Sequence, residues 1–274
     1  MTDTSKNGSC VVTGAARGIG RGIAERLVAQ GYSVVITDLD ADQVALTARE
    51  IGAVSGVQQD VRDPESHHRV AREALTHGAL RGWFNNAGVG WDGPLVDLDD
   101  AQVRGLVEIN VLGVFWGMRA ALASFEPAGR GGVRGGGGGG DVVNVASLSG
   151  LGPVPGLSVY AATKAAVVSA TMSVSLEAPK GVGVHAILPD GVATPMVESM
   201  KSDGLAKALV SSGGRLLTIE EIAEAAVDLM GSRRVLRTVP AWRGGAMRGS
   251  ALAPSLAAGA MKVFAAQGRR AQRH

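Results

Sequence analysis

The stretch Ser9-Cys-Val-Val-Thr-Gly-Ala-Ala-Arg-Gly-Ile-Gly20 decides the fold of this chain. Its first half is rich in β-branched residues and ends in glycine, which indicates a short buried strand. Its second half has the spacing GxxxGxG and leads into residues 23–28, whose apolar positions recur with the period of a helix. Glycines let the backbone turn sharply and approach a pyrophosphate, and the N-terminus of the following helix offers free N–H groups. We expect the contacts to a dinucleotide in this stretch to come from Gly14, Arg17, Gly18, Ile19 and Gly20.

The second strand signal, residues 32–37, ends at an acidic residue, Asp38. A carboxylate about 20 positions beyond a glycine-rich turn can accept hydrogen bonds from the adenosine ribose hydroxyls. Because it would also repel a 2′-phosphate, Asp38 favours NAD over NADP. Arg17 supports the alternative, NADP, because a basic residue in the turn can bind that phosphate.

Strand and helix signals alternate without a break from Ser9 to about Met230. This alternation predicts a single α/β domain, with a doubly wound (Rossmann-type), mostly parallel sheet and helices on both faces. We place the domain at residues 9–245, after a polar and frayed N-terminus at 1–8. A C-terminal extension at 246–274 is expected to be helical.

A glycine-rich segment at 128–140 interrupts the alternation and ends in six consecutive glycines. Glycine loses more backbone entropy on folding than any other residue, so we expect a flexible loop here. The loop enters the next strand at the sheet edge opposite the catalytic edge. We therefore expect no catalytic role for it.

The composition limits the partners and the location of the protein. The net charge is +2, so the overall balance predicts no affinity for nucleic acids. The single cysteine, Cys10, permits no internal disulfide, which fits the reducing cytoplasm. We find no N-terminal signal pattern and no apolar run of about 18 residues, and we expect a cytoplasmic protein without stable membrane insertion.

The histidines show no metal-ligand pattern. His67 and His68 are adjacent and point apart, and no cysteine lies near them in the sequence. We expect both of these residues and His77 on exposed helix surface, and His185 as a hydrogen-bonded residue of a strand. The sequence therefore predicts no metal site.

Tyr160 and Lys164 lie four residues apart, on one face of an expected helix. An ammonium group beside a phenol stabilises the phenolate and lowers its pKa from the usual value of about 10. A shift of about three units, which would let the tyrosine exchange protons with an alcohol near neutral pH, requires on the order of 4 kcal/mol. Lys164 needs help to supply that, and the cationic ring of an oxidised nicotinamide can provide it.

Further motifs occur in a fixed order, and with this pair they resemble the short-chain dehydrogenase/reductase (SDR) family. Ser147 precedes Tyr160 by 13 residues, which is the family's usual interval. The resemblance extends from about Ser9 to about Met196. The motifs that carry it are residues 13–20, Asp60-Val61, Asn85-Asn-Ala-Gly88, Asn110, Ser147, Tyr160-x-x-x-Lys164 and residues 189–194.

The resemblance implies four catalytic residues. Tyr160 would be the general acid/base that protonates a carbonyl oxygen or deprotonates an alcohol, and Ser147 would hydrogen-bond the same oxygen. Lys164 would bind the nicotinamide ribose and lower the pKa of Tyr160. Asn110 would hold a water that links Lys164 to solvent.

The resemblance also implies cofactor contacts beyond the glycine-rich turn. Asp60 and Val61 would meet the adenine, and residues 86–88 would form the wall beside the adenosine. Residues 189–194 would face the nicotinamide carboxamide, although Asp190 separates the proline and glycine that are usually adjacent in the family. The full set expected from these segments is Asp60, Val61, Asn86, Ala87, Gly88, Tyr160, Lys164, Pro189, Gly191, Val192 and Thr194.

The C-terminal part departs from the family pattern. We expect the last strand at 237–242 and a loose echo of the family's final turn at 243–245. Residues 255–267 have the pattern of an amphipathic helix, which can cover the substrate cleft, pack on a partner subunit or touch a membrane surface. Because the apolar stripe is rich in alanine, packing on protein is favoured.

The walls of the expected substrate pocket are apolar. They come from residues 89–91 and 148–157 and from a lid at about 196–217. The apolar lid residues are Met196, Val197, Met200, Leu205, Leu209 and Val210. Such walls suit a hydrophobic secondary alcohol or ketone.

We therefore expect an NAD-dependent oxidoreductase that transfers hydride between a nicotinamide cofactor and a secondary alcohol or ketone. One alternative is an NADPH-dependent ketone reductase, and another is a non-catalytic dinucleotide-binding sensor. The complete Ser147, Tyr160 and Lys164 set argues against a sensor, which needs no acid/base pair. Residues 110–123 and 160–176 resemble the helices that build subunit interfaces in the family, so a homodimer or homotetramer is expected.

Overall fold

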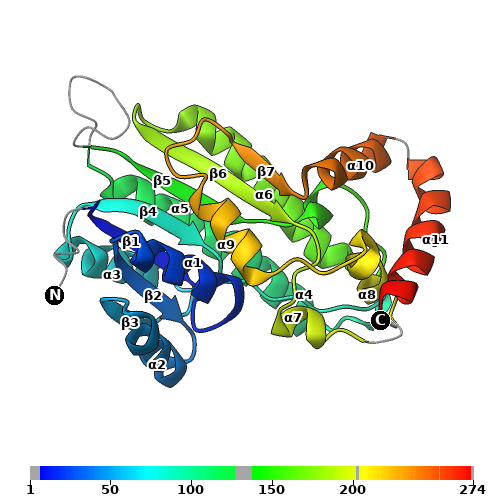
Figure 1. Cartoon of the computed structure of the whole chain (residues 1–274), viewed down its shortest axis with the longest axis horizontal. Helices are drawn as coiled ribbons and strands as arrows, with labels where there is room; N and C mark the ends of the chain where they lie inside the picture. The colour runs from blue at the N-terminus through cyan, green and yellow to red at the C-terminus, as the bar shows by residue number, and fades with distance from the viewer. Residues whose placement is uncertain (1–6, 127–137, 202–203, 253, 273–274) are drawn as a thin grey trace.

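Seven parallel strands form one sheet in the computed structural model, which describes residues 7–126, 138–201, 204–252 and 254–272 (Figure 1). The strands are β1 (Ser9–Thr13), β2 (Ser33–Asp38), β3 (Ser55–Gln58), β4 (Leu80–Asn85), β5 (Gly140–Val145), β6 (Val182–Pro189) and β7 (Leu236–Val239). Their order is β3-β2-β1-β4-β5-β6-β7, and each neighbouring pair is parallel. The order reverses between β1 and β4, the type of position where open α/β sheets bind ligands. The doubly wound fold predicted from the sequence is confirmed.

Helices cover both faces of the sheet because alternate strand residues point to opposite sides. Val12 belongs to the core beneath α1 (Gly18–Ala29), α2 (Ala41–Ile51) and α9 (Ile219–Val227). Its neighbour Val11 belongs to the core beneath α3 (Pro64–Thr76), α5 (Gly113–Ser124) and α6 (Ser158–Glu177). A parallel sheet buried on both faces explains why all five residues of β1 are buried.

The C-terminal part of the chain lies beyond the carboxyl ends of the strands. Figure 1 shows α10 (Ala241–Leu252) next to the end of β7, and α11 (Pro254–Ala271) next to α8 (Leu205–Val210). The last strand ends at Val239, earlier than expected, because Pro240 has no N–H to continue the ladder. Trp242 and residues 243–245 are therefore helical, and the turn expected at 243–245 is wrong.

One histidine differs from expectation. His67 is fully buried because it shares the inward face of α3 with Val70, Ala71 and Ala74. Its Nε2 lies 2.9 Å from the carbonyl oxygen of Val61, and burial lowers the pKa of the ring. The expectation of an exposed His67 is therefore wrong.

His185 agrees with expectation. It is a buried residue of β6, and its Nε2 lies 2.9 Å from Asp141 Oδ1. Its Nδ1 lies 2.6 Å from the carbonyl oxygen of Arg234, so both ring nitrogens have partners. His185 is therefore a satisfied residue of the sheet.

Two helical stretches are long and apolar enough to cross a membrane by length and composition alone. They are Asp100–Ser124, which contains α4 (Asp100–Val107) and α5, and Ser158–Glu177, which is α6. The expectation that no such apolar run exists is therefore wrong. In this fold α5 and α6 both cover the sheet, which is how core helices pass the same test.

Some sequence-based expectations fall outside the described residues. Of the N-terminal segment, residues 1–6 lie outside, and of the glycine-rich loop, residues 128–137 lie outside. Gly140, the last residue expected in that loop, begins β5. Of the expected lid at 196–217, residues 202–203 lie outside, and the rest includes most of α7 (Pro195–Glu198) and all of α8.

Candidate active site

A cavity of about 1220 Å³ follows the carboxyl ends of the strands and extends beneath the C-terminal helices. Its wall takes residues from the segments that follow the first six strands in sequence order. Of the catalytic and cofactor-binding residues that the sequence nominates, only Gly20 and Asn110 are absent from the wall. Those that line it are Gly14, Arg17, Gly18, Ile19, Asp38, Asp60, Val61, Asn86, Ala87, Gly88, Ser147, Tyr160, Lys164, Pro189, Gly191, Val192 and Thr194.

The glycine-rich turn after β1 depends on two left-handed glycines. Gly14 has φ +62° and Gly18 has φ +61°, a region that side chains disfavour. A Cβ at Gly14 would lie 2.6 Å from Ala87 Cα, so this glycine allows two chain segments to approach. A Cβ at Gly18 would meet no atom within 4 Å, so the backbone there faces open space.

The N-terminus of α1 fits a phosphate group. Its N-cap residue, Arg17, makes no side-chain capping bond, and its first turn contains no acidic residue. In contrast, α2 is capped by Asp40, α3 by Asp63 and α9 by Thr218. Free N–H groups at a helix N-terminus form an anion site. The pyrophosphate of a dinucleotide therefore fits this turn.

Asp38 stands at the end of β2, beside the glycine-rich turn. Its Oδ2 accepts a hydrogen bond from Ala16 N at 3.0 Å, and its Oδ1 accepts one from Leu39 N at 2.8 Å. These bonds fix the carboxylate in the cavity wall, and each oxygen keeps a second lone pair for a ribose hydroxyl. Arg17 is exposed at the same end of the cavity.

Asp60 has a partner that the sequence did not reveal. Arg62 Nη2 lies 2.6 Å from Asp60 Oδ2, and Arg62 Nε donates to both carboxylate oxygens at 3.0 Å. The Arg62 guanidinium holds the pKa of the Asp60 carboxyl below its usual range. Both residues line the cavity, so the negative charge of Asp60 at this end is balanced by the guanidinium of Arg62.

Asn86 and Ala87 are fixed to the first strand. Asn86 Nδ2 donates to the carbonyls of Thr13 and Gly14, at 2.9 and 2.8 Å. The backbone N–H groups of Asn86 and Ala87 both donate to Thr13 Oγ1 at 3.1 Å. These bonds tie the end of β4 to the glycine-rich turn. Gly20 supports this junction, since a Cβ there would lie 2.4 Å from Asn86 Nδ2.

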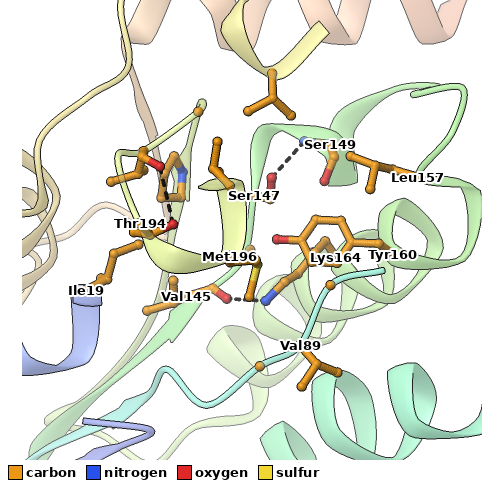
Figure 2. A pocket seen from close by; sticks show the side chains of 18 of the residues that line it. Ile19, Val89, Val145, Ser147, Ser149, Leu157, Tyr160, Lys164, Thr194 and Met196 are labelled. Carbon is orange, nitrogen blue, oxygen red and sulfur yellow. Dashed lines mark hydrogen bonds between the residues drawn. The ribbon is translucent and has the colours of Figure 1, made fainter. Parts of the chain in front are cut away.

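Ser147 and Tyr160 meet at the other end of the cavity. Ser147 follows β5 and caps a short 3₁₀ turn, η4 (Leu148–Leu151), by accepting a hydrogen bond from Ser149 N at 3.2 Å. Figure 2 shows the Ser147 hydroxyl and the Tyr160 hydroxyl directed toward the same space. Burial raises the pKa of Tyr160 to about 12, and a hydrogen bond with Ser147 opposes that shift.

Lys164 lies one turn after Tyr160 on α6 and is 4% exposed. Its Nζ donates to the carbonyl of Val145 at 2.8 Å and lies 5.6 Å from the centre of the Tyr160 ring (Figure 2). Burial lowers the pKa of this ammonium group to about 8. Burial of the phenol is the dominant influence on the pKa of Tyr160, and the lowering of that pKa by Lys164 stays an expectation from the family resemblance.

Asn110 lies behind the cavity wall, in the π-helical turn Glu108–Leu112. Its side chain accepts from Val89 N and donates to Val89 O, both at 2.9 Å, and donates to Thr163 Oγ1 at 3.2 Å. A Cβ at Gly88 would lie 3.2 Å from Asn110 Oδ1 and 3.6 Å from Lys164 Nζ. Asn110 therefore fixes the loop after β4 close to Lys164.

Asp190 and Arg243 form a buried ion pair that sequence reasoning missed. Arg243 is 7% exposed, and its Nη2 also donates to Ser212 Oγ at 2.9 Å. The available signal was Asp190 itself, which departs from the expected Pro-Gly pattern. Its arginine partner lies 53 residues further along the chain, and no local pattern connects the two.

The substrate end of the cavity is mostly apolar. The loop after β4 supplies Val89 and Trp91, and the lid region supplies Met196, Val197, Met200, Leu209 and Val210. Leu205 is 42% exposed and does not line the cavity. The C-terminal helices add Met247, which the sequence did not assign to the pocket, and Phe264, which belongs to the segment 255–267 that could cover the substrate cleft.

Comparisons with known proteins agree with this geometry. A family model described as short chain dehydrogenase matches residues 9–205. L-2,3-butanediol dehydrogenase of Corynebacterium glutamicum is 34% identical over 201 residues, which cover 70% of this chain and 75% of that protein. Cyclohexanol dehydrogenase of Acinetobacter sp. (strain SE19) is 30% identical over 239 residues, covering 84% and 90%.

A steroid enzyme and a solved structure extend these similarities. The 3-alpha-(or 20-beta)-hydroxysteroid dehydrogenase of Mycobacterium tuberculosis (strain H37Rv) is 33% identical over 222 residues, covering 80% of each chain. The crystal structure of a short-chain dehydrogenase/reductase from Burkholderia phymatum in complex with NAD superposes with a TM-score of 0.75. It is 25% identical and covers 90% of this chain and 94% of that one.

Proposed function

The chain belongs to the short-chain dehydrogenase/reductase family of oxidoreductases, which act on CH–OH groups, and from this premise we propose that it is an NAD-dependent dehydrogenase of a hydrophobic secondary alcohol. One observation carries the proposal. The hydroxyls of Ser147 and Tyr160 face the same space in a single cavity that also contains Asp38 and the uncapped N-terminus of α1. One long ligand with a pyrophosphate in its middle suits that arrangement.

A bound nicotinamide would supply hydride transfer to or from the alcohol carbon, and the residues of this chain would orient the substrate and move the proton. Tyr160 takes the hydroxyl proton in the oxidation direction and gives it back in the reduction direction. Ser147 holds the same oxygen by a hydrogen bond and stabilises the charge that develops on it. Lys164 would hold the ribose hydroxyls with the N–H groups that are not donated to the carbonyl of Val145.

Asp38 supports NAD rather than NADP. Its carboxylate is fixed beside the turn by the N–H groups of Ala16 and Leu39. A 2′-phosphate bound there would be repelled by the fixed negative charge of the Asp38 carboxylate. The exposed Arg17 supports the second candidate, an NADPH-dependent ketone reductase, since its side chain is free to swing toward such a phosphate.

Apolar walls support a hydrophobic substrate. Met196, Met200 and Leu209 line the cavity, and flexible methionine side chains adapt to apolar ligands of different shapes. The relatives are named as dehydrogenases of butanediol, cyclohexanol and hydroxysteroids, which all carry secondary hydroxyl groups, and this supports a secondary alcohol or its ketone as the substrate.

We also propose a cytoplasmic homodimer or homotetramer. Apolar side chains remain exposed on the helices expected at the interface, among them Phe115 at 37%, Met172 at 44% and Leu176 at 89%. A second copy of the chain would cover this surface. Light scattering that shows only a monomer at micromolar concentration would contradict this assignment.

A titration of the purified protein with NADH and with NADPH, followed by nicotinamide fluorescence, tests the proposal. We expect NADH to bind at least about tenfold more tightly, which corresponds to about 1.4 kcal/mol. The opposite preference would support the NADPH-dependent reductase, and binding of neither would refute the cofactor site.

Turnover then separates the enzyme from a sensor. Tyr160→Phe should retain NADH binding and lose alcohol oxidation by about 10²-fold or more, because the proton acceptor is removed. Unchanged turnover in this variant would refute the role of Tyr160.

A further inference from the structure

The hydroxyl of Ser149 is a buried polar group without an assigned role. Ser149 lines the cavity and is 9% exposed, and its Oγ has no hydrogen-bond partner within the described part of the chain. Leaving a buried hydroxyl unpaired costs about 1–3 kcal/mol. Folded proteins pair nearly all such groups, so an unpaired one in a ligand cavity points to a partner on the ligand.

The position of Ser149 is set by the turn that carries Ser147. Ser149 N donates to Ser147 Oγ at 3.2 Å. Because a serine hydroxyl lies close to its own backbone nitrogen, this bond keeps the Ser149 hydroxyl near the Ser147 hydroxyl. Figure 2 shows the Ser149 hydroxyl directed toward the space between Ser147, Leu157 and Tyr160. The turn is packed tightly on α6, since a Cβ at Gly150 would lie 2.7 Å from the carbonyl carbon of Lys164.

We propose that Ser149 hydrogen-bonds a second oxygen of the substrate, carried by the carbon next to the reacting carbon. The inference rests on the proposed function and deepens it. It names the substrate class as vicinal diols in the oxidation direction and α-hydroxyketones in the reduction direction. Oxygens on adjacent carbons are close enough for two hydroxyls of one short turn to bind both. Ser149 takes no part in hydride or proton transfer.

A change of rotamer lets the hydroxyl follow the ligand. Serine has three staggered χ1 positions and reaches them without backbone movement. The neighbouring wall is apolar at Val154 and Leu157, so a substrate hydroxyl placed there finds few other partners. The unpaired Ser149 therefore favours a substrate that brings its own second oxygen.

Ser250 provides a matched control. It lines the same cavity, but its Oγ already donates to the carbonyl of Met247 at 2.7 Å. A serine whose hydroxyl is satisfied within the protein should not discriminate between substrates with one and two oxygens. Ser149→Ala and Ser250→Ala remove the same atom from two walls of one cavity.

The experiment compares butane-2,3-diol with butan-2-ol, which share a carbon skeleton, in the wild type and both variants. We expect the wild type to prefer the diol in kcat/KM by about tenfold, the effect of one hydrogen bond to a buried group. In Ser149→Ala, kcat/KM for the diol should fall to about the value for butan-2-ol. The kcat/KM for butan-2-ol should change by less than about twofold. Ser250→Ala should keep the preference, and both variants should keep the wild-type affinity for NADH.

Stability gives a second readout. Because Ser149→Ala removes an unpaired hydroxyl, its unfolding midpoint should equal or exceed that of the wild type. A clear loss of stability would show that the hydroxyl has a protein partner and would overturn the inference. An equal loss of activity on both alcohols, no loss on either, or a wild type without preference for the diol would overturn it as well.

Failure of the inference is distinguishable from failure of the proposed function. A wild type that oxidises butan-2-ol or cyclohexanol but shows no preference for the diol refutes the substrate class and leaves the dehydrogenase intact. A protein that oxidises none of these alcohols with NAD or NADP refutes both.

Discussion

The guanidinium of Arg243, on α10, lies with Nε 2.8 Å from Oδ2 of Asp190, the residue that follows β6. The side chains are 9% and 12% exposed, so both charges are largely removed from water. The Arg243 guanidinium also lies 5.5 Å from the ring centres of Trp242 and Phe264. The C-terminal helices are thus connected to the loop expected to face the nicotinamide.

We expect this ion pair to show strong thermodynamic coupling. Arg243→Met leaves the Asp190 carboxylate buried without its cation, and Asp190→Asn leaves the cation without its carboxylate. Each single change should lower the free energy of unfolding by about 3 kcal/mol, because an unpaired buried charge is costly. The double variant should lose less than the sum of the two, by at least about 1 kcal/mol.

Urea denaturation at pH 7 measures all four proteins of this cycle. Additive losses would contradict a direct interaction between the two side chains. A double variant that is fully stable but binds substrate poorly would assign the pair to the shape of the cavity rather than to folding.

Asp38 should control the choice of cofactor. Asp38→Asn keeps the size of the side chain and one acceptor oxygen but removes the negative charge. We expect the ratio of NADPH to NADH dissociation constants to fall at least about tenfold, because the repulsion of a 2′-phosphate is relieved. Fluorescence titration with both nucleotides measures this ratio. An unchanged ratio would exclude Asp38 as the discriminating residue, and Arg17→Ala, which should weaken NADPH alone, is the control.

The sequence predicts the strand ends of this fold well because local patterns encode them. The β-branched run before Gly14 and the acidic residue at the end of β2 are short-range signals, and both place residues at one edge of a parallel sheet. Ser147 and Tyr160 meet for a related reason. Ser147 follows β5 and Tyr160 lies in the first turn of α6, and the segment 148–157 connects them.

Local sequence patterns do not predict contacts between segments that are distant in the chain. Arg243 pairs with Asp190 only because α10 folds back over the end of β6, and no local sequence pattern around either residue predicts the other as its partner. The pKa of Tyr160 also depends on segments that are distant in the sequence. The helix spacing reveals Lys164 as a neighbour, but burial, which raises the pKa of the phenol, depends on the whole fold.

Alcohol oxidation should accelerate with pH. Burial raises the pKa of Tyr160 to about 12, so the phenolate that accepts the proton is a minor form at pH 7 and becomes more abundant as the pH rises. We expect kcat/KM for oxidation to rise between pH 7 and pH 10, by at most about tenfold per unit. Ketone reduction uses the neutral phenol and should not rise over this range. A flat oxidation profile would contradict the assignment of Tyr160 as the base, and Tyr160→Phe should lack the slope.

Lys164 should make the stability of the protein rise with pH above about pH 8. Burial lowers the pKa of Lys164 to about 8, from its ordinary value of 10.5. Between these two values the unfolded chain holds a proton that the folded chain has released, so this residue makes stability rise with pH. Cys10 acts against it, because burial raises the pKa of its thiol and that effect reduces stability above its ordinary pKa of 9.0.

The difference between the wild type and Lys164→Met isolates the lysine from the thiol. From pH 8 to pH 10 the free energy of unfolding of the wild type should gain about 2 to 3 kcal/mol relative to the variant, since each pKa unit corresponds to about 1.36 kcal/mol. Urea denaturation at both pH values measures this gain. A constant difference would mean that the ammonium group keeps its proton in the folded protein, held by the carbonyl of Val145 at 2.8 Å. Lys164 would then face the cofactor as a fixed cation throughout the pH range of catalysis.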